Sequence, residues 1–194
     1  MLRTLTYNGK TFRTQLIETK DFQNFKISTL HGDAVKDKCL ALFPRKINGK
    51  YAIISRLDGE NLFLIYSDDL YYWNNAKIFR EPKESWEFIQ LGNCGSPIET
   101  DAGWILITHA GGPFRKYVIS TLLLDLDDPT RIIDSLKEPL IEPDESEREG
   151  YVHNVVYSCG AMVHNNYLII PYAMSDSASG FVKIKLEELL QKLI

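Results

Sequence analysis

The chain has 194 residues, of which 44% are hydrophobic, and its 22 basic and 26 acidic side chains give a formal net charge of −4. This composition can bury a sizeable core and excludes a disordered, collagen-like or coiled-coil protein. The small negative charge gives no electrostatic reason to expect nucleic acid or an anionic membrane as a partner.

The cysteines and the N-terminal residues bear on the cellular compartment. Cys39, Cys94 and Cys159 form no CxxC pair and have no histidine at zinc-ligand spacing, so we expect reduced thiols and no metal site. The first residues lack the apolar core and cleavage site of a signal peptide. No stretch approaches the roughly 18 apolar residues of a membrane helix. We therefore expect a cytoplasmic protein that does not cross a membrane.

Short β-branched or aromatic runs predict strands in most of the chain. The four clearest span residues 51–55, 62–66, 104–108 and 167–171. Each is too short for a typical helix and is bounded by Gly, Asn or Asp. One short helix is predicted at the end, over 185–194, because leucines at 186, 189, 190 and 193 share a face.

A turn, an aromatic residue and an aliphatic strand recur in that order. Asn48-Gly49 precedes Tyr51, Ala102-Gly103 precedes Trp104, and Asn165-Asn166 precedes Tyr167. The aromatic residues are 53 and then 63 positions apart. The Asn and Gly residues suit the positive-φ positions of a tight hairpin.

A second motif is interleaved with the first. A small polar residue, Asp, an apolar residue and an aromatic residue occur in that order around Asp21 and Asp69, with a looser copy over 124–129. Two motifs that both recur at intervals of roughly 50–60 residues are typical of β-propeller blades. An irregular all-β sandwich could also contain hairpins, but it would not explain this regular interleaving.

The predicted fold is therefore an all-β, incomplete propeller that forms one partial domain over residues 1–194. At this spacing the chain holds about three to three and a half blades, whereas a closed propeller needs at least four. We expect the chain to correspond to the later part of a larger ring.

Polar clusters lie at the ends of the predicted strands. They span residues 55–61, 92–100, 108–113, 150–160 and 171–176. A propeller presents strand-end residues and loops of this kind toward a central site, on a rigid scaffold.

These segments resemble the C-terminal part of glycoside hydrolase family 130. They include Ser55-Arg56-Leu57-Asp58-Gly59-Glu60-Asn61 and Gly92-Asn93-Cys94-Gly95-Ser96-Pro97-Ile98-Glu99-Thr100, and the resemblance runs from about Tyr7 to Gly180. The family comprises β-mannoside phosphorylases and hydrolases built on a five-bladed propeller. The resemblance implies inverting cleavage of a β-mannosidic bond, by phosphate or by water, without a metal or organic cofactor.

The general acid is one departure from the family pattern. The family resembled here carries a catalytic aspartate in a Glu-Asp-Pro-Arg-like motif, and residues 1–7 resemble the strand just after it. No Glu-Asp-Pro occurs in this sequence. We therefore expect the chain to lack its general acid and to need a complementary N-terminal half for activity.

The phosphate site is a second departure. Phosphorylases of the family typically have a lysine where this sequence has Glu99, and a carboxylate would repel phosphate. In the hydrolytic branch a pair of acidic side chains activates water instead. Glu60 and Glu99 suit that catalytic role by residue type, so the resemblance favours hydrolysis over phosphorolysis.

The resemblance also implies a set of substrate-binding residues. They are Arg56, Asp58, His109, Tyr151, Asn154, Tyr172 and Asp176, and the expected ligand is a β-mannoside or related oligosaccharide, with inorganic phosphate as a second candidate. The residues alone leave structural alternatives open: Arg56 could pair with Asp58 or Glu60, Glu99 could be a solvated acid, and His109 could be a satisfied semi-buried histidine.

Two further expectations concern the whole chain. The alternative function is a non-catalytic, carbohydrate-binding remnant of a propeller. An open ring has two exposed flanks, so we expect self-association or a complementary partner chain to cover them.

Overall fold

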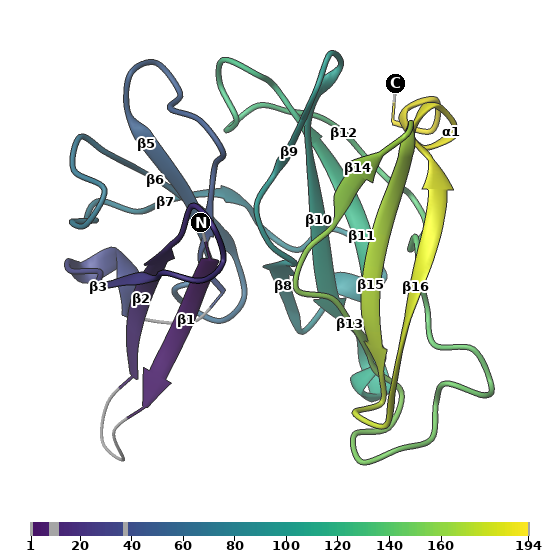
Figure 1. Ribbon diagram of the computed structural model, residues 1–194. Helices are drawn as coiled ribbons and strands as arrows, with labels where there is room; N and C mark the ends of the chain where they lie inside the picture. Colours follow the sequence, from purple (N-terminus) through teal and green to yellow (C-terminus); the bar gives the residue numbers. More distant parts are fainter. Residues whose placement is uncertain (1, 8–11, 37–38, 194) are drawn as a thin grey trace.

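The computed structural model describes residues 2–7, 12–36 and 39–193, and it is almost entirely β-structure with one short C-terminal helix. Four antiparallel sheets follow one another along the chain and stand side by side as blades (Figure 1). In the described part of the chain, no helix has both the length and the apolar character that crossing a bilayer requires.

The first two blades come from the N-terminal part of the chain. The first blade contains β1 (Leu2–Tyr7), β2 (Phe12–Glu18) and β3 (Lys26–Thr29). The second blade contains β4 (Ala41–Leu42), β5 (Tyr51–Ser55), β6 (Leu62–Ser67) and β7 (Lys77–Arg80). Single 3-10 turns follow β3 (Asp33–Val35) and β7 (Ser85–Glu87).

The last two blades form the C-terminal part. The third blade contains β8 (Gln90–Asn93), β9 (Ile98–Thr100), β10 (Gly103–Gly111), β11 (Tyr117–Leu124) and β12 (Ile132–Ser135), with a 3-10 turn at Pro113–Arg115. The fourth blade contains β13 (Val156–Tyr157), β14 (Met162–His164), β15 (Tyr167–Met174) and β16 (Ala178–Lys185). The helix α1 (Leu186–Leu190) follows β16.

The strand pairing amounts to about three and a half blades, as the repeat spacing predicts. The second blade is a complete four-stranded sheet. In the third, β8 and β9 both pair with β10 and together act as one interrupted strand, which also makes four positions. The first blade has three positions, and so has the fourth, because β13 and β14 both pair with β15.

All four clearest strands predicted from the sequence are present, within β5, β6, β10 and β15. The helix is shorter than predicted, because α1 ends at Leu190. Beyond it the main chain tightens: Lys192 N–H donates to Leu189 C=O and Leu193 N–H to Leu190 C=O, which are three-residue spacings.

Both recurring motifs are turns. Asn48 and Gly49 have φ of 49° and 81°, and Asn165 and Asn166 have φ of 48° and 63°, which are the left-handed values of a tight hairpin. Gly103 also has a positive φ, and a Cβ there would lie 2.5 Å from the carbonyl oxygen of Leu124. The turn–aromatic–strand motif therefore begins the second strand position of the last three blades.

The aspartate motif connects the last two strand positions of each of the first three blades. In each copy a carboxylate accepts backbone N–H groups two or three residues further on. Asp21 binds Gln23 and Asn24, Asp69 binds Tyr71, and Asp125 binds Asp127 and Asp128. Each aspartate thereby replaces backbone hydrogen bonds that the turn cannot make itself.

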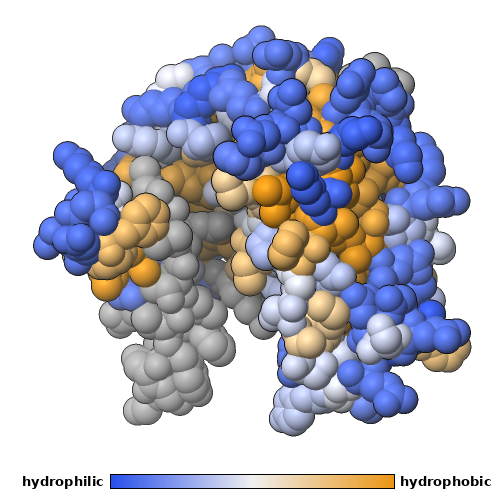
Figure 2. Space-filling view, turned by 45° about the vertical axis from the view of Figure 1, so that its right-hand side comes forward, coloured by the Kyte–Doolittle hydropathy of each residue, from blue (hydrophilic) through white to orange (hydrophobic). Residues whose placement is uncertain are grey.

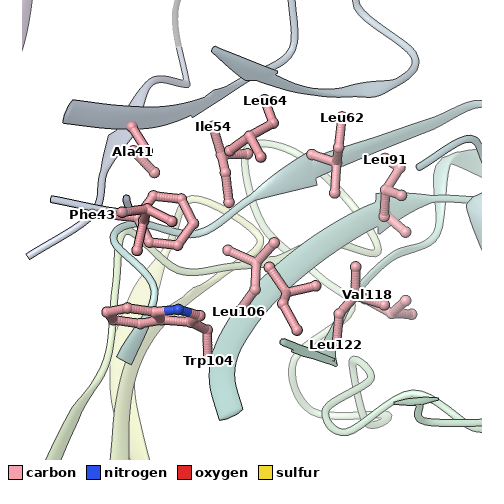
Figure 3. Close-up of a cluster of buried hydrophobic side chains, with 14 residues drawn as sticks. Ala41, Phe43, Ile54, Leu62, Leu64, Leu91, Trp104, Leu106, Val118 and Leu122 are labelled. Atoms are coloured by element: carbon pink, nitrogen blue, oxygen red, sulfur yellow. The ribbon is translucent and has the colours of Figure 1, made fainter. Parts of the chain in front are cut away.

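The core lies between blades, and β10 is at its centre. All nine residues of β10 are buried, because its two faces meet different neighbours. Trp104, Leu106 and Ala110 pack on the second blade, where the Trp104 ring meets Phe43 edge to face at 5.1 Å (Figure 3). Ile105 and Ile107 pack on the fourth blade. This double burial holds the end of β10 rigidly.

The outer face of the fourth blade is apolar and uncovered. Leu168 and Ile170 of β15 face the core, so alternation turns Ile169 and Pro171 the other way. Met162 pairs with Ile169 and Phe181 with Pro171, and these two outer residues are 55% and 73% exposed. Figure 2 shows a hydrophobic area on this side of the molecule.

Candidate functional site

Polar residues from three blades gather at one end of the strands, which is the lower end in Figure 1. The chain leaves β5 into Arg56, and His109 lies near the end of β10, opposite Gly92 of β8. The long connection from β12 to β13 and the β15–β16 turn lie at the same end (Figure 1).

Arg56 and His109 form the buried centre of this site. An Nη atom of Arg56 lies 3.4 Å from Nε2 of His109, and the two side chains come from the second and third blades. Arg56 is 7% exposed and His109 is 1% exposed. The structure thus brings together two residues predicted to bind substrate.

Three further residues hold the imidazole in place. Nδ1 of His109 lies 3.7 Å from Sγ of Cys94, and the Tyr157 ring is centred 4.8 Å from the imidazole. A Cβ at Gly92 would lie 2.4 Å from the ring, so only glycine leaves space for it. Burial raises the pKa of the Cys94 thiol and of the Tyr157 hydroxyl, which keeps both groups neutral.

The charge of Arg56 is not balanced by an acid. Among the described residues, no carboxylate lies within ion-pair distance of Arg56, and its Nε is buried without a hydrogen-bond partner. The structural alternative, a pair with Asp58 or Glu60, is therefore not found. A buried guanidinium without a counter-ion is a favourable place for an anion.

Asp58 supports the loop after Arg56. One carboxylate oxygen accepts the N–H groups of Glu60 and Asn61 at 2.9 and 2.8 Å, and the other accepts the Asn61 amide at 2.6 Å. Desolvation acts to raise the pKa of Asp58, but these hydrogen bonds outweigh it and the pKa is lowered. Asp58 thus shapes the turn beside Arg56.

The two predicted catalytic acids are not brought together. The carbonyl oxygen of Glu60 accepts the Leu91 N–H at 2.9 Å, so Glu60 lies beside β8 at the same end as His109, with its side chain exposed. Glu99 of β9 pairs with Trp104 and forms an ion pair with Arg45 at 2.7 Å. His109 lies five positions further along β10 than Trp104, about 17 Å on an extended strand.

The remaining predicted residues lie on the connection from β12 to β13 and near the β15–β16 turn. The Tyr151 side chain is 90% exposed. Asn154 has a φ of 65°, and its carbonyl accepts the Tyr117 N–H at 3.0 Å. The Tyr172 hydroxyl donates to Glu147 at 2.7 Å, which raises the pKa of Tyr172 to about 12. Asp176 is exposed in the turn itself.

An open hollow of about 770 Å³ lies beside these loops. It is lined by Lys116, Arg148, Glu149, Gly150, His153 and Asn154. Of the predicted residues, Asn154 reaches it directly, and Tyr151 adjoins it through Gly150. Amide, imidazole and cationic groups of this kind can bind the hydroxyl groups of a sugar.

Several residues of the site were not predicted to have a role. Cys94 and Tyr157 contact His109, while Lys116, Arg148 and His153 line the hollow. Cys94 and Tyr157 occur within the strand-end clusters, which was the only signal for them in the sequence. In the described ranges, no group of three or more His, Cys, Asp or Glu side chains is arranged to hold a metal ion.

Comparisons with known proteins agree with this architecture. Residues 2–193 match the sequence profile of glycoside hydrolase family 130, described as β-1,4-mannooligosaccharide phosphorylase. A 1,2-β-oligomannan phosphorylase of Thermoanaerobacter sp. strain X514 is 37% identical over 155 residues, which cover 79% of this chain and 52% of that protein. A β-1,2-mannobiose phosphorylase of Listeria innocua is 30% identical over 188 residues, which cover 92% and 52%.

Solved structures match in the same way. The Listeria innocua β-1,2-mannobiose phosphorylase, in complex with β-1,2-mannobiose, superimposes with a TM-score of 0.81 at 27% identity, covering 98% of this chain and 59% of that one. The chain therefore spans about half the length of the curated relatives it matches, and its blades form part of a five-bladed propeller. With this fold and a family match over nearly its whole length, the chain belongs to glycoside hydrolase family 130.

Proposed function

We propose that this chain provides the phosphate-binding part and much of the sugar-binding part of a β-mannoside phosphorylase. The observation that carries the proposal is the buried Arg56, which has no acidic partner in the described residues and is in contact with His109. In phosphorolysis, inorganic phosphate attacks the anomeric carbon from the face opposite the leaving group. Arg56 would hold that dianion by charge-assisted hydrogen bonds.

The relatives support phosphate as the attacking group. The two curated relatives described above are named as phosphorylases, at 37% and 30% identity. A structure reported with family members that hydrolyse β-1,2-mannosidic linkages is 21% identical, a level that supports the fold alone.

Hydrolysis, which the family resemblance favours, requires two acids acting on one water. Glu99 lies at the far end of β10, where it pairs with Arg45, and only Glu60 lies at the end that carries Arg56. The strand position that Glu99 pairs with lies about 17 Å along β10 from His109, and the Glu99 carboxylate is already paired with Arg45, so we expect it neither to repel a phosphate at Arg56 nor to activate a water there. The geometry therefore favours phosphorolysis over hydrolysis.

The proposal includes an acid from outside these 194 residues. Inverting cleavage needs a general acid to protonate the departing oxygen. The sequence contains no Glu-Asp-Pro segment. We expect the chain alone to bind phosphate and mannoside without cleaving the glycosidic bond.

Phosphate binding tests the central claim. Inorganic phosphate is titrated into the 194-residue chain by calorimetry or ³¹P NMR, with Arg56→Gln and the control Arg45→Gln, whose guanidinium instead pairs with Glu99. We expect saturable binding by the unmodified chain, a loss of about tenfold or more with Arg56→Gln, and little change with Arg45→Gln. Absent binding by a folded chain, or equal effects of the two substitutions, would contradict the proposal.

Product analysis separates the reaction types. The chain is incubated with β-1,2-mannobiose, with and without phosphate. Mannose 1-phosphate from the chain alone would support phosphorolysis but contradict the external acid. Release of mannose without phosphate would support hydrolysis and overturn the proposal.

A further inference from the structure

Three loops carry unusually exposed aromatic side chains, at the end of the strands where Arg56 and His109 lie. Phe114 is 95% exposed, Tyr151 is 90% exposed and Phe88 is 78% exposed. Across the described residues, these are the three most exposed of the large hydrophobic side chains. Their concentration at the end that carries Arg56 and His109 calls for an explanation, since rings of this size are ordinarily buried.

The three loops are neighbours. The Ile89 N–H donates to the Gly111 carbonyl at 2.8 Å, which ties the loop of Phe88 to that of Phe114. A Cβ at Gly112 would lie only 3.1 Å from the backbone of Trp86. On the other side, the Tyr117 N–H donates to the Asn154 carbonyl at 3.0 Å, which ties the loop of Phe114 to that of Tyr151.

The main chain holds the Phe114 ring away from the core. Phe114 and Arg115 have φ of 58° and 55°, two consecutive left-handed residues, neither of which is glycine. Hydrogen bonds from Gly112 N–H to Lys116 C=O and from Lys116 N–H to Pro113 C=O close this strained loop. Strained positions of this kind are concentrated at ligand sites.

Charged residues lie near two of the three rings, those of Phe114 and Tyr151. Arg115 and Lys116 follow Phe114 in the chain, and the hollow lined by Lys116 and Arg148 lies between the loops of Phe114 and Tyr151. Separated rings among hydrogen-bonding groups suit a sugar, which offers an apolar C–H face and a rim of hydroxyl groups. A protein partner would fit a continuous apolar patch better.

We infer that Phe88, Phe114 and Tyr151 form a stacking platform for mannosyl units beyond the two that flank the cleaved bond. The inference rests on the proposed function and adds a preference for substrate length: longer β-mannooligosaccharides should bind more tightly than the disaccharide. The hollow takes the sugar next to the cleaved bond, and the platform holds the units that extend outward from it.

Binding of two saccharides of different length tests the platform. β-1,2-Mannobiose and a β-1,2-mannopentaose are titrated into the 194-residue chain, followed by tryptophan fluorescence and calorimetry. The variants are Phe88→Ala and Phe114→Ala, with Phe181→Ala as a control, because Phe181 is 73% exposed on the outer face of the fourth blade. We expect the pentaose to bind more tightly, and each of these two platform variants to lose about tenfold in pentaose affinity with mannobiose affinity unchanged.

Every other result counts against the platform. Equal loss of affinity for both saccharides, no loss with any platform variant, or the same loss with Phe181→Ala would overturn it, and so would a chain that binds neither saccharide. The phosphate titration with Arg56→Gln tests the proposed function independently of the platform. Phosphate binding with an unchanged saccharide ratio refutes the platform alone, whereas absent phosphate binding refutes the proposed function.

Discussion

Nε2 of His109 lies 3.4 Å from an Nη atom of Arg56, across the boundary between the second and third blades. A guanidinium can only donate hydrogen bonds, so a hydrogen bond between these groups requires Nε2 to accept and to carry no proton. The ring proton would then lie on Nδ1, which faces Sγ of Cys94 at 3.7 Å. This arrangement suits a neutral imidazole.

This arrangement predicts the tautomer of His109. We expect ¹⁵N chemical shifts to show a neutral ring protonated at Nδ1 in the folded chain near pH 7. With Arg56→Gln the side-chain amide could either donate or accept, so this preference should weaken. A doubly protonated ring, or protonation at Nε2 in the unmodified chain, would show that the Arg56 contact is not a hydrogen bond of this kind.

Gly92→Ala should displace His109. The added methyl group would lie 2.4 Å from the imidazole, which is in contact with Cys94, Tyr157 and Arg56 and is 1% exposed. We expect a loss of about 1–3 kcal/mol in the free energy of unfolding, together with weaker phosphate binding. Urea unfolding gives the first quantity and phosphate titration the second.

A double-mutant cycle supplies the control for this clash. With His109→Ala the ring is absent, so adding Gly92→Ala should cost far less than it does in the unmodified chain. If the two substitutions are additive, the ring of His109 is not what excludes a side chain at position 92.

Breaking the buried ion pair of Arg80 and Glu87 should cost far more stability than breaking an exposed pair. Both side chains are almost fully buried at 2.9 Å, and Glu87 also accepts the Lys83 and Glu84 N–H groups. Glu87→Gln leaves Arg80 buried without a counter-charge, so we expect a loss of about 3–5 kcal/mol in the free energy of unfolding.

The matched control is Asp68→Asn, which breaks the exposed pair with Lys50. Its expected cost is about 1 kcal/mol or less, because water screens both charges. Equal costs for Glu87→Gln and Asp68→Asn in urea unfolding would mean that burial does not set the strength of the Arg80–Glu87 pair.

Asp21 should contribute a pH-dependent term to stability. The backbone N–H of Asn24, followed by the Asn24 side chain and the Gln23 N–H, lowers the pKa of Asp21 from 3.8 to about 2. A lowered folded-state pKa means that this stabilisation is present above about pH 4 and is lost as the pH falls toward 2. NMR titration of the Asp21 carboxyl carbon checks the value, and an unshifted pKa would show that the turn is not formed in solution.

The apolar outer face of the fourth blade should drive self-association of the isolated chain. Met162 and Phe181 are exposed there beside Ile169 and Pro171. We expect light scattering to show concentration-dependent association, and Phe181→Glu to shift the chain toward the monomer. A monodisperse monomer at high concentration would contradict this prediction, whereas Tyr151→Glu, at the other exposed aromatic surface, should leave the association unchanged.

The sequence predicted those parts of the fold that depend on neighbouring residues. The hairpin of Asn48 and Gly49 and the turn of Asp21 are both formed by contacts within a few positions, so their residue types were sufficient evidence. The number of blades followed from the spacing of these turns. The helix was overestimated, because the spacing of its leucines could not show that the chain tightens after Leu190.

The site was harder to predict, because its contacts cross between blades. Arg56 and His109 lie in strand-end clusters, and the family resemblance implies that they bind substrate, but neither their contact nor the space left by Gly92 can be derived from one strand alone. For Glu99, the residue type suggests a role that its position in the fold does not support. Its residue type suited a catalytic base, yet its position opposite Trp104 pairs it with Arg45 instead.

Among the described residues, each of the four sheets is built from strands that follow one another along the chain. The entropy cost of closing loops is therefore small within every blade, and contacts between distant parts of the sequence are needed only where one blade packs on the next. During synthesis the sheets emerge from the ribosome one after another. Each new blade can thus fold against a partner that already exists, which limits the time that apolar surfaces of the growing chain spend in water.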